Sequence, residues 1–138
     1  MDKPIEIYFY YMNGCQWCND FMPTWKEMKK NRGVTSIISL EEKERGEMTK
    51  DEQTINGVPV DGFPTIKIVI NLSGKKIEYK YGKSEDSECT GDRSRDDILL
   101  CIKEQLEEEL TNRKMHGGKQ KMRYATRLGK NELYLGQI

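Results

Sequence analysis

The sequence predicts a single α/β domain with the element order βαβαββα. Four runs rich in aromatic and β-branched residues are typical of strands, and they cover residues 5–11, 34–40, 65–71 and 76–81. Apolar residues recur at helical spacing in 15–30 and again in 94–110. The 138 residues, 36% hydrophobic and 33% charged, are enough for one hydrophobic core and not for two.

The first strand leads into a helix and a second strand. The apolar side of this helix is formed by Phe21, Met22, Trp25 and Met28. Residues 31–33 (Asn-Arg-Gly) predict the end of the helix. With the strand at 34–40 this makes a βαβ unit, for which a right-handed crossover is expected.

The middle of the chain predicts a short helix and a hairpin. Residues 41–54 are highly charged, and Thr49 with Glu52 forms a capping-box pattern that predicts a helix over 49–55 at most. Ser73 and Gly74 separate two strand-like runs and predict a hairpin turn.

The last part of the domain predicts a loop and a helix. Residues 82–93 are polar and predict an exposed loop that contains Cys89. Ser94 with Asp97 predicts the cap of the final helix. Its apolar stripe consists of Ile98, Ile102, Leu106 and Leu110.

Cys15 and Cys18 form a C-x-x-C pair where the first strand passes into the first helix. Unpaired backbone N–H groups and the helix dipole favour a thiolate at this position, so we predict a redox-active dithiol with Cys15 as the nucleophile. Cys18 lies one helical turn further on and is predicted to be the resolving thiol.

The remaining candidate metal ligands do not have zinc-site spacing. A zinc site needs a second ligand pair, but Cys89 and Cys101 are far apart in sequence and His116 is the only histidine. We therefore predict no metal and no cofactor. Cys101 adjoins the apolar stripe and is expected to be a core thiol, whereas Cys89, a loop thiol, either pairs with Cys101 or acts as an auxiliary redox thiol.

The N-terminal residues do not resemble a signal peptide, and no apolar stretch reaches membrane-spanning length. These observations predict a cytoplasmic protein without membrane contact. A reducing compartment makes a structural disulfide scaffold unlikely, which favours catalytic or buried thiols for the four cysteines.

The net charge of zero hides an uneven distribution. Residues 111–138 hold seven of the 23 Lys and Arg and one of the 23 Asp and Glu, a net charge of +6 against −6 for residues 1–110. We predict a basic C-terminal tail over 112–138 that docks on its own acidic domain or supports weak self-association. Seven cations on a flexible segment give only weak, screened phosphate contacts and do not favour nucleic-acid binding.

Three motifs resemble those of the thioredoxin superfamily, most closely its protein disulfide isomerase domains. They are C-Q-W-C with Pro23 five residues beyond, G-F-P-T-I-K at 62–67, and G-D-R-S-R-D-D-I at 91–98. The resemblance implies a thioredoxin-like domain over 1–111 with a mixed central sheet flanked by helices. A small thioredoxin fold with an acidic body and a tail is also similar to those encoded by large DNA viruses, and for a virus-encoded protein the virion is the alternative to the cytoplasm.

The resemblance also implies roles for four further residues. Pro64 would be a cis proline beside the dithiol, and Phe63 would offer its backbone to an extended substrate; the alternative for Pro64 is an ordinary strand-entry proline. Trp17 would contact substrate or cover the rim of the site. Arg93 resembles a loop arginine that stabilises the resolving thiolate, with a solvated loop cation as the alternative.

The sequence departs from the family at the buried acid that relays protons to the second thiol. Phe9 occupies that position, and Glu6 is out of register and would point to the other face of the strand. Gly14 replaces a tryptophan, and the pair between the cysteines is nearer to that of glutaredoxins. Resolution of a mixed disulfide is therefore expected to be slow.

Together these features predict a thiol–disulfide oxidoreductase that reduces, forms or exchanges protein disulfides. Its partners would be protein disulfides or dithiols, with a thioredoxin-type reductase or glutathione as the redox partner. The alternative is a redox-inactive adaptor or structural module whose basic tail recruits a partner. Phe9 at the position of the buried acid favours the adaptor. The intact cysteine pair, together with Phe63 and Pro64, favours the enzyme.

Overall fold

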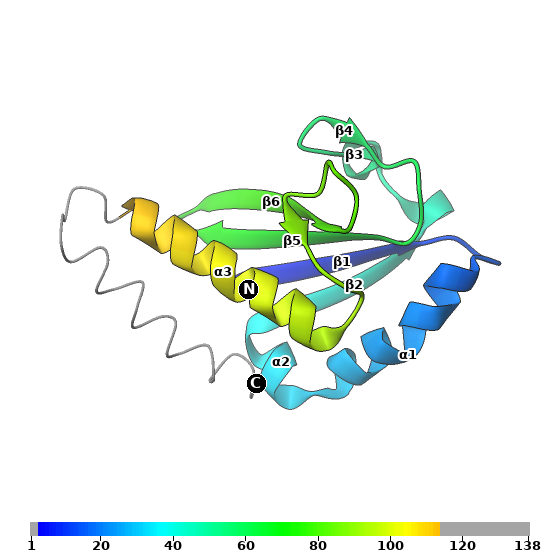
Figure 1. Ribbon diagram of the computed structural model, residues 1–138, viewed down its shortest axis with the longest axis horizontal. Helices are drawn as coiled ribbons and strands as arrows, with labels where there is room; N and C mark the ends of the chain where they lie inside the picture. Colours follow the sequence, from blue (N-terminus) through cyan, green and yellow to red (C-terminus); the bar gives the residue numbers. More distant parts are fainter. Residues whose placement is uncertain (1–2, 114–138) are drawn as a thin grey trace.

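The computed structural model describes residues 3–113, which form a five-stranded mixed sheet with three α-helices (Figure 1). The elements of the main sheet and its helices are β1 (Ile5–Tyr11), α1 (Gln16–Lys30), α2 (Arg32–Ile37), β2 (Ile38–Glu44), β5 (Thr65–Leu72), β6 (Lys75–Gly82), β7 (Cys89–Thr90) and α3 (Arg95–Arg113). Between β2 and β5 lie two 3₁₀ turns (Arg45–Glu47 and Lys50–Gln53) and the small hairpin of β3 (Thr54–Ile55) and β4 (Val58–Pro59).

The strands of the main sheet are ordered β2-β1-β5-β6-β7. β1 is parallel to β2 and antiparallel to β5, β5 is antiparallel to β6, and β6 is parallel to β7. The parallel β1–β2 pair requires a crossover, which α1 and α2 provide. The predicted β1–helix–β2 unit and the β5–β6 hairpin are both present.

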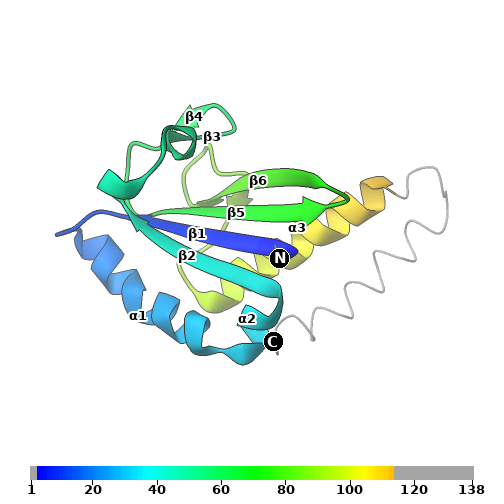
Figure 2. The ribbon, with the colours of Figure 1, turned by 180° about the vertical axis from the view of Figure 1, so that it is seen from behind.

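All three helices cover the same face of the sheet. Figure 1 shows α3 in front of the strands, and the reverse view in Figure 2 shows the strands in front of α3. Alternate residues of the strands point into this layer, as the period of a strand requires. The buried core between the sheet and the helices includes Ile5, Ile7, Phe9, Phe21, Trp25, Met28, Ile66, Ile68, Ile70, Ile98 and Ile102.

The second strand begins later than predicted, so the expectation of a strand over 34–40 is wrong for its first half. Asn31 accepts a hydrogen bond on its side chain from the backbone N–H of Val34 at 3.1 Å, and its backbone oxygen accepts from the N–H of Thr35 at 2.9 Å. This cap starts the short helix α2, in which Val34 is buried. β2 then continues through the charged residues up to Glu44.

The predicted short helix over 49–55 is a single 3₁₀ turn followed by a strand. The capping pattern is confirmed, because Glu52 accepts a hydrogen bond from the backbone N–H of Thr49 at 2.9 Å. The helix does not continue because Asn56 and Gly57, both with positive φ, turn β3 back onto β4. The predicted turn at 73–74 is present, also with positive φ at both residues.

The segment between β6 and α3 is not simply an exposed loop. Cys89 lies on the two-residue strand β7, is buried, and forms a disulfide with Cys101 of α3. The expectations that Cys89 is exposed and that Cys101 is a free core thiol are therefore wrong, whereas the pairing considered for them is present. The cap of α3 is confirmed, because Ser94 Oγ accepts from the N–H of Asp97 at 3.2 Å.

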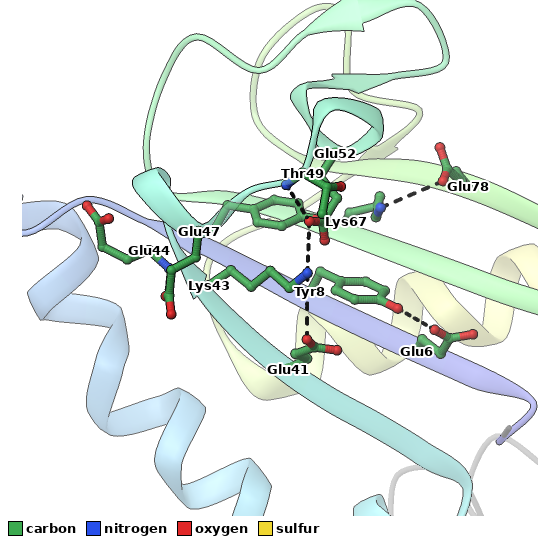
Figure 3. Close-up of polar contacts among 11 residues, drawn as sticks. Glu6, Tyr8, Glu41, Lys43, Glu44, Glu47, Thr49, Glu52, Lys67 and Glu78 are labelled. Carbon is green, nitrogen blue, oxygen red and sulfur yellow. Dashed lines mark hydrogen bonds and ion pairs between the residues drawn. The ribbon is translucent and has the colours of Figure 1, made fainter. Parts of the chain in front are cut away.

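The opposite face of the sheet carries tyrosine and charged side chains, shown in Figure 3. The Nζ of Lys67 lies 4.6 Å from the ring centroid of Tyr8 and 5.6 Å from that of Tyr10. It also pairs with Glu78 at 3.7 Å. The Tyr10 hydroxyl donates to Glu52 at 3.1 Å, which connects the segment between β2 and β5 to the centre of the sheet.

α3 extends to Arg113, and the rest of the predicted basic tail lies outside the described residues. Among residues 3–113, no helix is long and apolar enough to cross a membrane.

Candidate active site

Cys15 is the N-cap residue of α1. Its Sγ accepts a hydrogen bond from the backbone N–H of Cys18 at 3.2 Å, and the residue is 9% exposed. The first N–H groups of a helix have no partner within the helix, and the helix dipole is positive at this end. Cys15 thus lies at the helix position on which its prediction as the nucleophile depends.

Cys18 lies on the first turn of α1 and is only 1% exposed. Burial and a hydrogen bond with Cys15 raise the pKa of the Cys18 thiol to about 11. A backbone hydrogen bond with Met12 and the positive charge of Arg93 act in the opposite direction and lower this pKa. Cys18 is therefore protonated at neutral pH, and it must lose a proton before it can attack.

The backbone of Phe63 lies against Cys15. The Cys15 thiol faces the backbone oxygen of Phe63, with 3.6 Å between the sulfur and the oxygen, although the two residues are far apart in sequence. The peptide bond between Phe63 and Pro64 is cis. The side chain of Phe63 is partly buried against the core. Phe63, which the motif at 62–67 predicts for the site, thus lies next to Cys15, and the cis bond joins it to Pro64.

A groove of about 550 Å³ includes Phe63 and Pro64 in its lining. It is lined by three segments, 61–66 at the start of β5, 80–84 at the end of β6, and 91–93 before α3. Arg93 is exposed on its wall, and its charge lowers the pKa of Cys18. Phe63 lines the groove and its backbone oxygen faces Cys15, so one end of the groove lies beside the Cys15 sulfur.

Trp17 lies between the two cysteines and is 61% exposed. It makes no part of the hydrophobic core, in contrast to Trp25, which is fully buried. A large exposed aromatic side chain next to a reactive thiol is available to a substrate. The two uses predicted for Trp17, substrate contact and rim, both agree with this position.

Phe9 occupies the position on β1 where the resemblance to the thioredoxin superfamily implies a buried acid. It is fully buried and packs its ring against Phe21 at 5.1 Å and Trp25 at 5.4 Å, measured between ring centroids. Glu6 lies on the opposite face, where it accepts a hydrogen bond from the Asn71 amide. β1 therefore presents no carboxylate to the side of the sheet on which Cys18 lies.

Glu42 on the neighbouring strand β2 is the carboxylate opposite Phe9, and it is bound to side chains of α1. Glu42 pairs in register with Phe9, and it accepts hydrogen bonds from the Trp25 indole and the Lys29 ammonium, both at 2.8 Å. Although burial raises the pKa of Glu42, these two donors lower it below its ordinary value. Glu42 therefore stays ionised. It is bound to Trp25 and Lys29 of α1, about two to three turns after the turn that carries Cys18.

The sequence did not predict the parts of the site that come together only in the fold. The groove wall at 80–84 and the disulfide of Cys89 with Cys101 depend on contacts between β6, β7 and α3. The one available signal was the presence of two further cysteines, and their pairing cannot be deduced from sequence. Within residues 3–113, no group of three or more His, Cys, Asp or Glu could hold a metal ion.

The fold is similar to solved thioredoxin domains. The Trx4 domain of ERdj5 matches with a TM-score of 0.57 at 16% identity, over 77% of this chain and 82% of that chain. The J-Trx1 fragment of ERdj5 gives 0.50 at 21%, over 75% and 42%. The first thioredoxin domain of mouse protein disulfide-isomerase A4 gives 0.49 at 21%, over 75% and 64%.

No family model and no curated protein matches this sequence. Similarity at these identities establishes the fold alone. The chain has the thioredoxin-like α/β fold, with a mixed sheet flanked by helices, which confirms the predicted fold class.

Proposed function

We propose that this protein is a thiol–disulfide oxidoreductase that acts on protein disulfides through Cys15 and Cys18. The observation that carries the proposal is the placement of Cys15 Sγ, which accepts the Cys18 N–H at 3.2 Å and faces the Phe63 carbonyl at 3.6 Å. This sulfur is stabilised by a helix N-terminus and lies beside a backbone segment that an extended substrate can approach.

The proposed reaction begins at Cys15. Its thiolate attacks one sulfur of a substrate disulfide, the substrate S–S bond breaks, and the second substrate sulfur leaves as a thiolate that takes up a proton. Cys18 then loses its proton and attacks Cys15 Sγ. The first substrate sulfur leaves, the substrate has gained two electrons, and the protein holds a Cys15–Cys18 disulfide.

The second step is the difficult one in this chain. The Cys18 thiol has a pKa of about 11, and Phe9 supplies no carboxylate to accept its proton. Water or the leaving thiolate of the substrate therefore takes the proton. The same steps in reverse introduce a disulfide, so the reduction potential of the Cys15–Cys18 pair decides the direction.

Trapping tests the division of labour between the two cysteines. We expect Cys18→Ser to accumulate a mixed disulfide with a disulfide-bonded protein such as insulin, and Cys15→Ser to accumulate none. Iodoacetamide at neutral pH should modify Cys15 much faster than Cys18 in the reduced protein. Equal trapping by both variants, or equal alkylation rates, would contradict the assignment.

A redox-inactive adaptor is the second candidate, and the replacement of the buried acid by Phe9 together with the raised pKa of Cys18 favours it. The two candidates differ in one measurable quantity. Turnover in insulin reduction above that of the Cys15→Ser variant supports the enzyme, and no turnover despite normal folding supports the adaptor.

A further inference from the structure

We propose that the Cys89–Cys101 disulfide is a redox-controlled clamp that holds the groove wall carrying Arg93, so that its reduction alters the site of Cys15 and Cys18. The disulfide joins β7 to α3, and the groove wall is the stretch of chain between β6 and α3. This inference deepens the proposed function and rests on it for its effect on activity.

β7 is a short edge strand that the disulfide ties to α3. It consists of two residues at the edge of the main sheet and pairs only with the last two residues of β6. Cys89 lies 6.1 Å from Cys101, measured between Cα atoms, and Gln105 of α3 approaches the Cys89 sulfur at 3.9 Å. A strand of this length is marginal without further support, so the covalent bond is the main connection of β7 to α3.

The wall itself is held by a few polar contacts. The N–H of Gly91 donates to the Gly82 oxygen at 3.3 Å, and the N–H of Asp92 donates to Asp97 at 2.8 Å. The Tyr81 hydroxyl donates to the backbone oxygen of Asp92. Gly91 has no room for a side chain, because a Cβ there would collide with Tyr81. The contacts fix the position of 91–93 only while the chain on either side stays in place.

Polar contacts also hold the segment on its β6 side. The N–H of Lys80 donates to Glu88 at 2.8 Å, and the Lys80 ammonium pairs with Asp86 at 3.0 Å, so these contacts join the segment to β6 and not to α3.

Lys83 and Asp92 have side chains that are largely exposed to solvent, so their attraction contributes little. Cys89 is 4% and Cys101 is 2% exposed, so the disulfide is shielded until the segment opens locally. With the bond intact, the segment cannot leave α3; with the bond broken, it can open without unfolding the core.

The chemical step is reduction of the disulfide by a dithiol. A thiolate of the dithiol attacks one sulfur of the pair, the Cys89–Cys101 bond breaks, and a mixed disulfide forms. The second thiol of the reductant displaces the protein sulfur. The reductant leaves as a disulfide, and its two electrons and two protons remain on Cys89 and Cys101 as thiols.

The effect reaches the dithiol through Arg93. This residue lies four positions after Cys89 on the clamped segment, lines the groove, and its charge lowers the pKa of Cys18. When the segment opens, the guanidinium moves away from Cys18, and its screened influence on the Cys18 thiol is lost. The groove loses one of its three lining segments in the same movement.

Hydrogen exchange tests the clamp without any redox activity at the first pair. The variant Cys15→Ser/Cys18→Ser leaves only Cys89 and Cys101 to react with dithiothreitol, and mass spectrometry after alkylation counts the released thiols. We expect amides of 83–93 to exchange about tenfold or more faster after reduction, while amides of β1 stay unchanged. The oxidised variant is the matched control.

A double-mutant cycle tests the route through Arg93. In chains with Cys15→Ser, the pKa of Cys18 is read from the pH dependence of its alkylation. Arg93→Gln should raise this pKa when the disulfide is intact, and at least half of that rise should be lost in the Cys89→Ala/Cys101→Ala background. Lys83→Gln, which removes a cation from the same segment, is the control for a change in charge alone.

Three outcomes would overturn the clamp: unchanged exchange of 83–93 after reduction, faster exchange of 83–93 and β1 together, or an Arg93→Gln effect that is the same with and without the disulfide. Faster exchange of 83–93 and β1 together would show that the disulfide stabilises the whole domain, which unfolds when the bond is reduced. Failure of the proposed function is distinguishable, because the exchange experiment gives its answer in a chain that has no Cys15–Cys18 chemistry.

Discussion

Glu52 is expected to stabilise the fold strongly at neutral pH and weakly in acid. It is 8% exposed and lies on the face of the sheet opposite the helices (Figure 3). Its carboxylate accepts hydrogen bonds from Lys43 at 2.8 Å, the N–H of Thr49 at 2.9 Å and the Tyr10 hydroxyl at 3.1 Å. Burial alone would raise the pKa of Glu52, but these donors lower it from 4.5 to about 2.

The magnitude follows from the difference between the folded and unfolded pKa. Each pKa unit corresponds to about 1.4 kcal/mol, so ionised Glu52 contributes about 3 kcal/mol to the free energy of unfolding. Because the folded pKa is the lower one, this contribution is complete above pH 4.5 or so. It is lost as the pH falls from about 4.5 through the folded pKa of about 2, and only below that pKa is the carboxyl group protonated in both states.

The change to test is Glu52→Gln, which keeps the size of the side chain and removes its charge. Urea unfolding followed by circular dichroism should show a loss of about 2–3 kcal/mol at pH 7 and a much smaller loss near pH 2.5. Glu41→Gln is the matched control, because Glu41 is exposed and lies 3.8 Å from the same lysine. It should cost about 0.5 kcal/mol or less. Equal losses for the two variants at pH 7, or a Glu52→Gln loss that does not vary with pH, would refute the reasoning.

Three further changes have defined outcomes. Phe9→Glu should speed insulin reduction by supplying a proton acceptor, and it should lower the free energy of unfolding by about 3 kcal/mol or more; unchanged turnover would show that proton loss from Cys18 is not limiting. Trp17→Ala should change stability by less than about 0.5 kcal/mol and raise KM for a protein substrate, and an unchanged KM would assign Trp17 to the rim. Deletion of 114–138 leaves α3 whole and should preserve Cys15 alkylation while removing salt-sensitive association in size-exclusion chromatography; an unfolded product would contradict the domain boundary.

Local patterns were sufficient where sequence neighbours decide the structure. The cap at Ser94, the turn at 73–74 and the helix that begins after Cys15 each depend on residues within one turn of chain. The same reasoning failed at 34–37, because Val34 and its β-branched neighbours are typical of a strand. The side chain of Asn31 starts a helix there instead, and propensity is a weaker influence than this cap.

Distant contacts account for the features that the sequence could not predict. The sequence neighbours of Cys89 are polar, which predicts exposure. In the structure Cys89 is buried, because β6 and α3 enclose it from two sides. The side of the strand on which Phe9 and Glu6 lie was predictable from the period of two. The engagement of Glu42 with Trp25 was not, because it depends on how α1 lies across β2.

The environments of Trp17 and Trp25 give this chain two separate optical signals. Trp17 is solvent-exposed between the two cysteines, so we expect its emission at long wavelength and, under the proposed function, a change in its intensity when the Cys15–Cys18 disulfide forms. Trp25 is enclosed by Phe9 and Phe21 with its indole N–H bonded to a carboxylate, so we expect its emission at shorter wavelength until the interior is hydrated. One fluorescence spectrum would then report the proposed redox change and unfolding separately, without any added dye.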